Sequence, residues 1–307
     1  MNNKYINDLK KIINEEYGIA IDEMSEASRG VDGETWIINS MDIKYFVKIA
    51  YYSSHKQKFI NSINTLNLIN NYEINHVNHI IKTKTLKDYV LFNDRVLAIY
   101  NFVNGNIDYN YPYDKIIELL IPIYKISSIE NLDYEKYDIF GLIDETKQNI
   151  EKAKEYKELN EILNINNSLI VSYFDKIKEY YFKMDKNKKK FITHGDACVN
   201  CMVDNDNVVL IDFDDTLVAP IERDCWFFVD SKQKISYINN CLKEHDIDYE
   251  LSYDLLAFYA YKSALIYLND SATKYMETQK KDILSEIDEI LNGWVRRKIQ
   301  SIDNEEE

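Results

Sequence analysis

Two stretches of sequence decide the fold: His194-Gly195-Asp196-Ala197-Cys198-Val199-Asn200 and, shortly after it, Leu210-Ile211-Asp212-Phe213-Asp214-Asp215. Short β-like runs, Phe191-Ile192-Thr193 and Val208 to Ile211, lie on either side of the turn Asp204-Asn205-Asp206-Asn207. The surrounding chain has helical spacing, so this β-like interruption stands out. Polar residues gather in it at the points where the two runs end.

Three oxygen-bearing side chains in these stretches suit phosphoryl transfer. The carboxylate of Asp196, placed on a loop, can orient an alcohol and accept its proton. The amide oxygen of Asn200 and the carboxylate of Asp212 can hold Mg²⁺, which prefers hard oxygen ligands. No other part of the sequence offers this combination.

The N-terminal third has the patterns of an antiparallel sheet. The predicted elements are a helix at Asp8 to Tyr17, strands at Ile19 to Met24, Thr35 to Asn39 and Ile43 to Ile49, a helix at Ser54 to Asn71, and a hairpin of Tyr89 to Phe92 with Val96 to Phe102. Asn93-Asp94 marks the turn of that hairpin, because both residue types tolerate positive φ angles. Residues 1–102 are therefore predicted to form a β-rich lobe.

Long helical segments follow. They are predicted at Tyr113 to Ile126, Asp144 to Lys157, Leu169 to Met184, Leu255 to Leu268 and Thr273 to Ile299. A length of 307 residues exceeds what one hydrophobic core usually organises, so two domains are expected. We predict that residues 103–307 form a larger, mainly helical lobe.

Composition and charge exclude several classes of function. The 37 Lys and Arg against 52 Asp and Glu give a net charge of −15, which disfavours nucleic acid and anionic membranes and favours cationic ligands. The N-terminus has no apolar core of a signal peptide, and the apolar runs are broken by charges, so no membrane span is predicted. Four clustered cysteines are too few for a disulfide framework and indicate free thiols in a reducing cytoplasm.

The motifs together resemble a known family. His194-Gly195-Asp196-Ala197-Cys198, then Asn200, then Ile211-Asp212 look like the catalytic and metal-binding loops of aminoglycoside phosphotransferases. The segment Leu217 to Trp226 and the helix carrying Leu256-Ala257-Phe258-Tyr259 are similar to the spectinomycin-type members. Weaker correspondences are Phe46-Val47-Lys48 and the hinge-like Ile99 to Gly105, so the resemblance covers most of the chain.

This resemblance implies an α+β, protein-kinase-like fold of two lobes, with an antiparallel β-sheet lobe before the helical one. It implies the following roles: Asp196 as catalytic base, Asn200 and Asp212 as Mg²⁺ ligands, Lys48 on the nucleotide phosphates, Tyr100, Asn101 and Phe102 as the nucleotide hinge, and His194 and Asp224 as structural supports of the catalytic loop. The implied cofactors are Mg²⁺ and either ATP or GTP. The product would be a phosphate ester of a small-molecule acceptor.

The acceptor is the most open part of the prediction. A cationic aminoglycoside or aminocyclitol antibiotic is the leading candidate, with Asp215 and Glu222 predicted to contact its ammonium groups. The alternatives are a housekeeping kinase for choline, homoserine or a thio-sugar, and a kinase-like binding protein such as the spore-coat relatives of this fold. The same loops serve all of these, so the sequence does not separate them.

Two departures from the family pattern bear on the site. Asp196 and Asn200 enclose three residues where the family has four, which places Cys201 at the ungapped position of the metal ligand. Lys48 lacks the usual helix Glu, because Ser54 to Asn71 contains none, and Gln57 is the nearest polar substitute. The segment Arg29 to Gly33 fits both a phosphate-covering loop and a plain hairpin turn.

Overall fold

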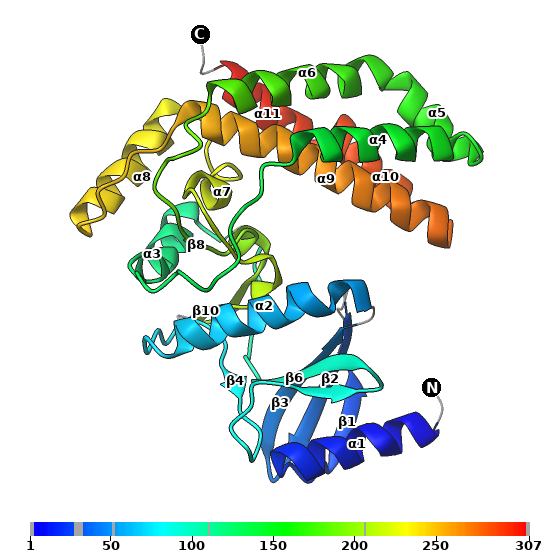
Figure 1. Cartoon of the computed structure of the whole chain (residues 1–307), viewed down its shortest axis with the longest axis vertical. Coiled ribbons are helices and arrows are strands. Elements are labelled where there is room, and N and C mark those ends of the chain that lie inside the picture. The colour runs from blue at the N-terminus through cyan, green and yellow to red at the C-terminus, as the bar shows by residue number, and fades with distance from the viewer. Residues whose placement is uncertain (1–2, 28–32, 51–52, 110, 206, 305–307) are drawn as a thin grey trace. The chain divides into compact units, whose positions relative to one another are not determined.

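The protein divides into two compact units. The structure, a computed structural model, describes residues 3–27, 33–50, 53–109, 111–205 and 207–304. Met1–Tyr134 with Phe191–Val218 form the first unit, and Glu135–Lys190 with Ala219–Glu307 form the second (Figure 1). The first unit thus extends past residue 102, and the confinement of nucleotide binding to residues 1–102 stays a prediction. Arg29 to Asp32 of the predicted glycine loop lie outside the described residues.

The first unit contains the predicted antiparallel sheet. Its elements begin with α1 (Asn3–Tyr17), β1 (Glu23–Glu26), β2 (Gly33–Ser40), β3 (Ile43–Ala50), α2 (Ser53–Asn70), β4 (Ile80–Ile81), β5 (Val90–Phe92) and β6 (Arg95–Asn101). The strand order is β1-β2-β3-β6-β4, with β5 also paired to β6. The β5–β6 hairpin turns at Asn93 and Asp94, which have φ angles of 50° and 62°, as the sequence predicts.

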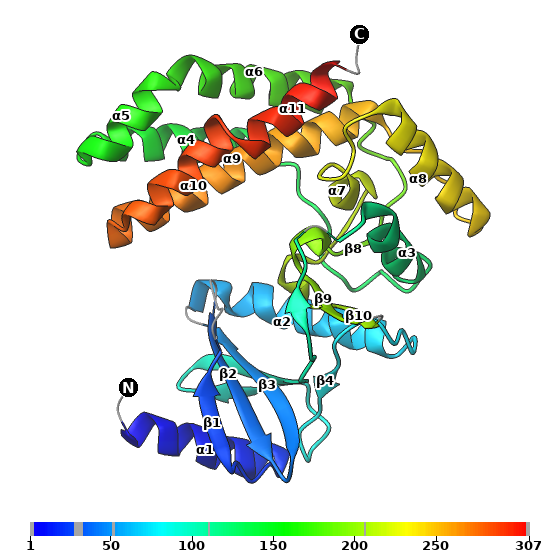
Figure 2. The same cartoon turned by 180° about the vertical axis from the view of Figure 1, so that it is seen from behind.

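Helix α1 covers one face of this sheet (Figure 2). Its buried residues Leu9 and Ile13 pack in one hydrophobic core with Val47 and Ile49 of β3. Side chains alternate between the two faces of a strand, so Lys48 lies on the opposite face of the sheet. One face of β3 therefore packs in the core with α1, and Lys48 points to the other face.

The remainder of the first unit holds the two loops on which the sequence analysis centres. Its elements are β7 (Asn106–Ile107), α3 (Tyr113–Tyr124), β8 (Phe191–Thr193), η1 (Ala197–Val199), β9 (Cys201–Asp204), β10 (Asn207–Leu210), η2 (Phe213–Asp215) and β11 (Leu217–Ala219). β9 pairs with both β10 and β7, and β8 pairs with β11. The strand that enters the Asp/Asn turn is therefore β9, and not the run at Phe191 to Thr193.

The second unit is helical throughout its described elements. These are α4 (Ile139–Ala153), α5 (Lys157–Ile165), α6 (Asn167–Lys183), α7 (Glu222–Cys225), α8 (Lys232–Glu244), α9 (Tyr253–Thr278), α10 (Lys281–Leu291) and α11 (Trp294–Asn304). Helix α9 is the central element, since α4, α6, α10 and α11 all pack against it (Figures 1 and 2).

Several helix boundaries in this unit were predicted wrongly, the clearest of them in α9. The sequence predicts separate helices at Leu255 to Leu268 and Thr273 to Ile299, but α9 runs unbroken from Tyr253 to Thr278. The polar residues between the predicted helices lie inside α9, where Asn269 is buried and accepts a hydrogen bond from Asn149. The real breaks come later, at Gln279, which has a φ angle of 52°, and at Gly293 between α10 and α11.

Within the described ranges, no helix is both long enough and apolar enough to cross a membrane.

Candidate functional site

His194 joins the two loops from inside the protein. Its ring is fully buried and lies 4.5 Å from the ring of Phe213, centre to centre. The backbone N–H of Asp196 donates to Nδ1 at 3.3 Å, so the proton resides on Nε2, which donates to the carbonyl oxygen of Ile211 at 3.0 Å. Both ring nitrogens are thus used within the loops, which supports the predicted structural role.

Asp196 is partly exposed, and its carboxylate is oriented by neighbours in the same loop. The side-chain nitrogen of Asn200 donates to the backbone oxygen of Asp196 at 2.9 Å and to its Oδ2 at 3.1 Å. The thiol of Cys198 donates to Oδ1 at 4.0 Å, a weak contact. Because Asn200 uses its amide nitrogen here, its amide oxygen remains the atom with which it could bind a cation.

Asp212 adopts a backbone conformation that is uncommon for residues other than glycine, although Asp tolerates it better than most. Its φ and ψ angles are 61° and 68°, in the left-handed region, at the junction between β10 and η2. The N–H of the preceding Ile211 donates to the carbonyl oxygen of Asn200 at 3.0 Å. This bond places the two predicted metal ligands, Asn200 and Asp212, on neighbouring segments of backbone.

Lys48 reaches this loop from β3. Its Nζ lies 2.9 Å from Oδ1 of Asp212 and 2.6 Å from Oδ2 of Asp214. Burial lowers the pKa of Lys48, but the carboxylates of Asp214 and Asp212 outweigh burial and raise it above its usual range. Burial raises the pKa of Asp214 to about 6, although the charge of Lys48 opposes the shift. Residues distant in sequence therefore form one charged cluster.

The contact between Lys48 and Gln57 that the sequence suggests does not form. Gln57 donates to the side-chain oxygen of Asn61 at 2.7 Å, within α2. Lys48 instead forms ion pairs with Asp212 and Asp214, which lie in the loop that follows β10. The lysine is thus oriented by carboxylates of the predicted metal loop and not by the helix.

The three predicted hinge residues lie at the end of β6. Tyr100 is buried and packs against Phe46, with ring centres 6.5 Å apart, and burial raises the pKa of its hydroxyl well above the usual value. Asn101 is held next to the segment that precedes β4, because its N–H donates to the carbonyl oxygen of His79 at 2.9 Å. Phe102 follows the strand and is only partly buried.

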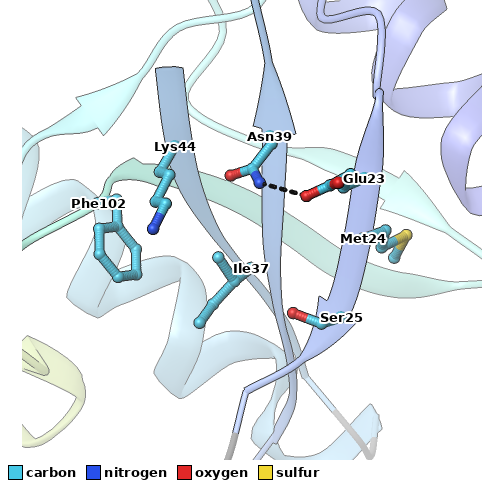
Figure 3. Close-up of a pocket in the computed structure, with 7 residues that line it drawn as sticks. All are labelled: Glu23, Met24, Ser25, Ile37, Asn39, Lys44 and Phe102. Atoms are coloured by element: carbon cyan, nitrogen blue, oxygen red, sulfur yellow. Dashed lines mark hydrogen bonds between the residues drawn. The ribbon is translucent and has the colours of Figure 1, made fainter. Parts of the chain in front are cut away.

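Phe102 also lines a pocket of about 410 Å³ on the sheet (Figure 3). The lining residues are Glu23, Met24, Ser25, Ile37, Asn39, Lys44 and Phe102. Strand alternation puts Lys44 on the same face of β3 as Lys48. Lys44 Nζ lies 5.5 Å from the centre of the Phe102 ring, and Asn39 donates to Glu23 at 3.0 Å. Apart from Phe102, these residues were not singled out from the sequence, although the alternation in β3 could have indicated Lys44.

The fold of this chain is similar to that of solved phosphotransferases. No protein-family model matches the chain, and no curated protein matches its sequence. The solved spectinomycin phosphotransferase APH(9)-Ia, in complex with ADP and spectinomycin, is 15% identical over 97% of this chain and 98% of its own, with a TM-score of 0.78. The amicoumacin kinase hAmiN, with AMP-PNP and Ca²⁺, is 12% identical over 99% and 94%, with a TM-score of 0.61.

A third solved structure points the same way. The aminoglycoside phosphotransferase from Alicyclobacillus acidocaldarius is 17% identical over 94% of this chain and 95% of its own, with a TM-score of 0.54. The chain has the aminoglycoside phosphotransferase fold. At these identities the comparison establishes the fold alone, and it confirms the sheet-plus-helix, kinase-like architecture that the sequence predicts.

Within this phosphotransferase fold, the first predicted acceptor contact has another partner. Oδ1 of Asp215 lies 2.7 Å from Nζ of Lys58 on α2. About half of each side chain is exposed, at 49% for Asp215 and 54% for Lys58, so the pair lies at the surface of the first unit. Asp215 is thus engaged in an ion pair within the unit that contains Lys48.

The second predicted acceptor contact, Glu222, is fully buried at the start of α7 in the second unit. One carboxylate oxygen pairs with Lys188 at 3.0 Å and accepts from the N–H of Ser252 at 2.6 Å, and the other accepts from Tyr249 at 2.5 Å. Neither oxygen is available to an ammonium group, so the structure does not support the predicted contact. Asp224 is also buried in α7, and its support of the catalytic loop stays a prediction.

The donor set of the first unit fits a hard, partly hydrated cation. Among the residues that the structure describes, no group of three or more His, Cys, Asp or Glu side chains could hold a metal ion. Asp212 and Asn200 instead offer one carboxylate and one amide oxygen on adjacent backbone segments. Mg²⁺ is commonly bound by one or two protein oxygens together with waters and substrate phosphates, so these residues fit that ion.

Proposed function

We propose that this protein is a Mg²⁺- and nucleotide-dependent small-molecule kinase. It transfers the γ-phosphate of ATP or GTP to a hydroxyl group of a cationic acceptor, an aminoglycoside or aminocyclitol antibiotic. The observation that carries this proposal is the pairing of Lys48 with Asp212, next to a loop in which Asn200 orients Asp196. Solved structures with this fold include phosphotransferases in complex with ADP and an antibiotic.

Asp196 acts on the acceptor in the proposed mechanism. Its carboxylate accepts a hydrogen bond from the attacking hydroxyl and orients that oxygen toward the γ-phosphorus. As the new bond between oxygen and phosphorus forms, the bond to the β-phosphate oxygen breaks, and the hydroxyl proton passes to Asp196. The hydrogen bond from Asn200 to Oδ2 at 3.1 Å fixes the rotation of the carboxylate, so that Oδ1 faces the acceptor.

Lys48 serves the nucleotide. In the proposed complex its ammonium group leaves the carboxylates of Asp212 and Asp214 and binds phosphate oxygens instead. Only 13% of the Lys48 side chain is exposed, so its position in the first unit is largely set before nucleotide arrives. A charge that is already in position stabilises the transition state more strongly in a site that excludes water than it would in water, because it needs no reorganisation during the reaction.

Asp212 and the amide oxygen of Asn200 are the residues that would hold Mg²⁺. When bound, the ion neutralises charge on the β- and γ-phosphates. The assignment to Asn200 is favoured over Cys201 by acidity. Burial, assisted by the charge of Asp108, raises the pKa of the Cys201 thiol to about 12, so the thiol stays protonated at neutral pH. A neutral thiol is a poor ligand for Mg²⁺.

This assignment gives a prediction at two adjacent positions. Asn200→Ala should raise the Mg²⁺ concentration needed for half-maximal activity, because it removes a metal ligand. Cys201→Ala should leave that concentration unchanged and cost about 1 kcal/mol of stability, since the fully buried Cys201 begins β9 and acts by packing. Mg²⁺ titrations of the rate and urea unfolding of both variants provide the measurement. A shift with Cys201→Ala but not with Asn200→Ala would contradict the assignment.

The net charge of −15 supports a cationic acceptor. Attraction between this charge and a polycation accelerates encounter, and salt screens it over a Debye length of about 10 Å at 0.1 M. For the true acceptor, kcat/KM should therefore fall as the ionic strength rises above about 0.1 M. Steady-state rates at constant Mg²⁺ and increasing KCl test this. Salt-independent rates would indicate a neutral acceptor.

A coupled assay of ADP release tests the proposed function. Aminoglycosides, spectinomycin, choline and homoserine are supplied in turn, with ATP and then with GTP as the donor. We expect ADP or GDP release that requires Mg²⁺ and is stimulated by at least one aminoglycoside or by spectinomycin. Stimulation only by choline or homoserine would assign the chain to housekeeping metabolism instead.

A further inference from the structure

Helix α2 contacts the η2 turn through side chains that are spaced along one face. Nζ of Lys58 lies 2.7 Å from Oδ1 of Asp215, and the hydroxyl of Ser62 donates to Oδ1 of Asp214 at 3.5 Å. Residues four apart lie on the same side of a helix, so Lys58 and Ser62 approach η2 together. Between them in sequence, Phe59 is buried, with its ring centre 5.8 Å from Nζ of Lys48.

The residue before η2 needs such support. Asp212 has a φ angle of 61°, and a left-handed conformation at a residue other than glycine costs free energy and persists only where its surroundings fix it. On the N-terminal side, the bond from Ile211 to Asn200 fixes the chain. On the C-terminal side, the N–H of Thr216 donates to the carbonyl oxygen of Phe213 at 3.1 Å, and this hydrogen bond closes the η2 turn. Neither of these two hydrogen bonds connects η2 to the sheet, so other contacts have to hold the turn next to it.

Lys48 cannot hold the turn throughout a reaction cycle. Its two ion pairs are with Asp212 and Asp214, and in the proposed function the lysine transfers its charge to nucleotide phosphates. The pair of Lys58 with Asp215 does not involve a proposed ligand or a phosphate contact. It therefore remains available when nucleotide is bound.

We propose that Lys58 and Asp215 are positioning residues that hold η2, and with it Asp212, in the geometry that binds Mg²⁺; this role rests on the proposed function. In protein kinases, a helix glutamate orients the strand lysine. Here α2 contains no acidic residue, and it contributes a cation that acts on the metal loop instead. In protein kinases the helix contributes an acidic residue that contacts a lysine, whereas here α2 contributes a lysine that contacts an acidic residue.

The sign of the effect on Mg²⁺ separates this role from simple electrostatics. Replacing Lys58 by Gln removes a positive charge near a cation site, and Coulomb repulsion alone would then lower the Mg²⁺ concentration needed for half-maximal rate. Loss of positioning has the opposite effect, because η2 samples conformations in which Asp212 is misplaced. An increase in the Mg²⁺ requirement is therefore specific to positioning.

The experiment uses Lys58→Gln, Asp215→Asn, the double variant and Lys58→Arg in the full chain. We expect each single neutral variant to raise the Mg²⁺ concentration for half-maximal phosphoryl transfer about 1.4- to fivefold, the range for one exposed ion pair. The double variant should match the single ones, because both changes remove the same pair. Lys58→Arg keeps the pair and should behave as the unaltered chain does. Lys56→Gln, on the same helix, is the matched control for charge.

Three results would overturn the proposal: an unchanged or lowered Mg²⁺ requirement in Lys58→Gln, effects that multiply in the double variant, or an equal shift in Lys56→Gln. Nucleotide affinity measured without Mg²⁺ should stay the same in all variants, which separates metal positioning from general damage to the site. If the unaltered chain shows no Mg²⁺-dependent turnover at all, the proposed function fails first, and the role of Lys58 fails with it.

Discussion

Asp196→Asn is expected to lower kcat by about 10²–10⁴-fold, the usual contribution of a positioned general base. Asparagine has nearly the same shape as aspartate but cannot accept the acceptor's proton. The nucleotide dissociation constant should stay within about twofold, because Lys48 and Asp212, rather than Asp196, face the phosphates in the proposed complex. Steady-state kinetics at saturating acceptor and calorimetric titration of nucleotide measure the two quantities separately.

The matched control is Asp204→Asn, which makes the same chemical change at the exposed last residue of β9. This variant should retain the activity of the unaltered chain. Near-normal turnover in Asp196→Asn would remove Asp196 from the mechanism. An equal loss of activity in both variants would indicate a general effect of charge.

Glu222→Ala is expected to lower the free energy of unfolding by about 3–5 kcal/mol, the cost of removing one partner from a buried ion pair. Tyr249 and the N–H of Ser252 lose the Glu222 carboxylate as acceptor in this variant, and Lys188 loses its ion pair, although its Nζ still donates to the carbonyl oxygen of Glu250. Only 18% of the Lys188 side chain is exposed, so water compensates poorly. Burial alone raises the pKa of Tyr249, so in the variant its hydroxyl stays protonated and loses the Glu222 carboxylate as acceptor.

Urea unfolding followed by circular dichroism measures this loss. Glu244→Ala, at an exposed position in the same unit, serves as control and should change stability by no more than about 0.5 kcal/mol. If Glu222 bound the acceptor instead, its replacement would weaken acceptor binding and leave stability nearly intact. That outcome would contradict the structural role given to Glu222 here.

Local patterns predicted the sheet and indicated the two loops of the candidate site. The alternation of Val47 and Ile49 against Lys48 is visible in sequence because one face of β3 is buried and the other is not. Asn93 and Asp94 indicated their turn for an equally local reason, since both residues tolerate positive φ angles. Cys201 as the first, buried residue of β9 also followed from the apolar run after Asn200.

Features that depend on contacts between distant segments could not be predicted in this way. Asn269 is a residue type typical of loops, yet it lies inside α9, where its side-chain oxygen accepts a hydrogen bond from Asn149 of another helix. The burial and ion pairing of Glu222 could not be predicted either, because its partners Lys188 and Tyr249 lie well before and well after it in the chain. Gly293 was one local signal of a helix boundary that the sequence contained and the prediction did not use.

The pairing of Lys58 with Asp215 is the clearest example of a contact in the candidate site without a sequence signal. A lysine on an amphipathic helix is ordinarily a solvated surface residue. Only the packing of α2 against η2 shows that this one meets a carboxylate of the metal loop. The family pattern directed attention to an absent glutamate, whereas the structure provides a cation at the same helix.

The central claim is that this chain transfers a phosphoryl group to a small-molecule hydroxyl, and transfer of ³²P from γ-labelled ATP or GTP to an acceptor tests it most directly. Acceptor and nucleotide are separated by thin-layer chromatography after incubation with Mg²⁺, for the unaltered chain and for Asp196→Asn. We predict label on an aminoglycoside or aminocyclitol with the unaltered chain, and a loss of about 10²–10⁴-fold in its rate of appearance with the variant. Label that stays on nucleotide or appears only as inorganic phosphate with every acceptor, or equal transfer by both proteins, would contradict the account.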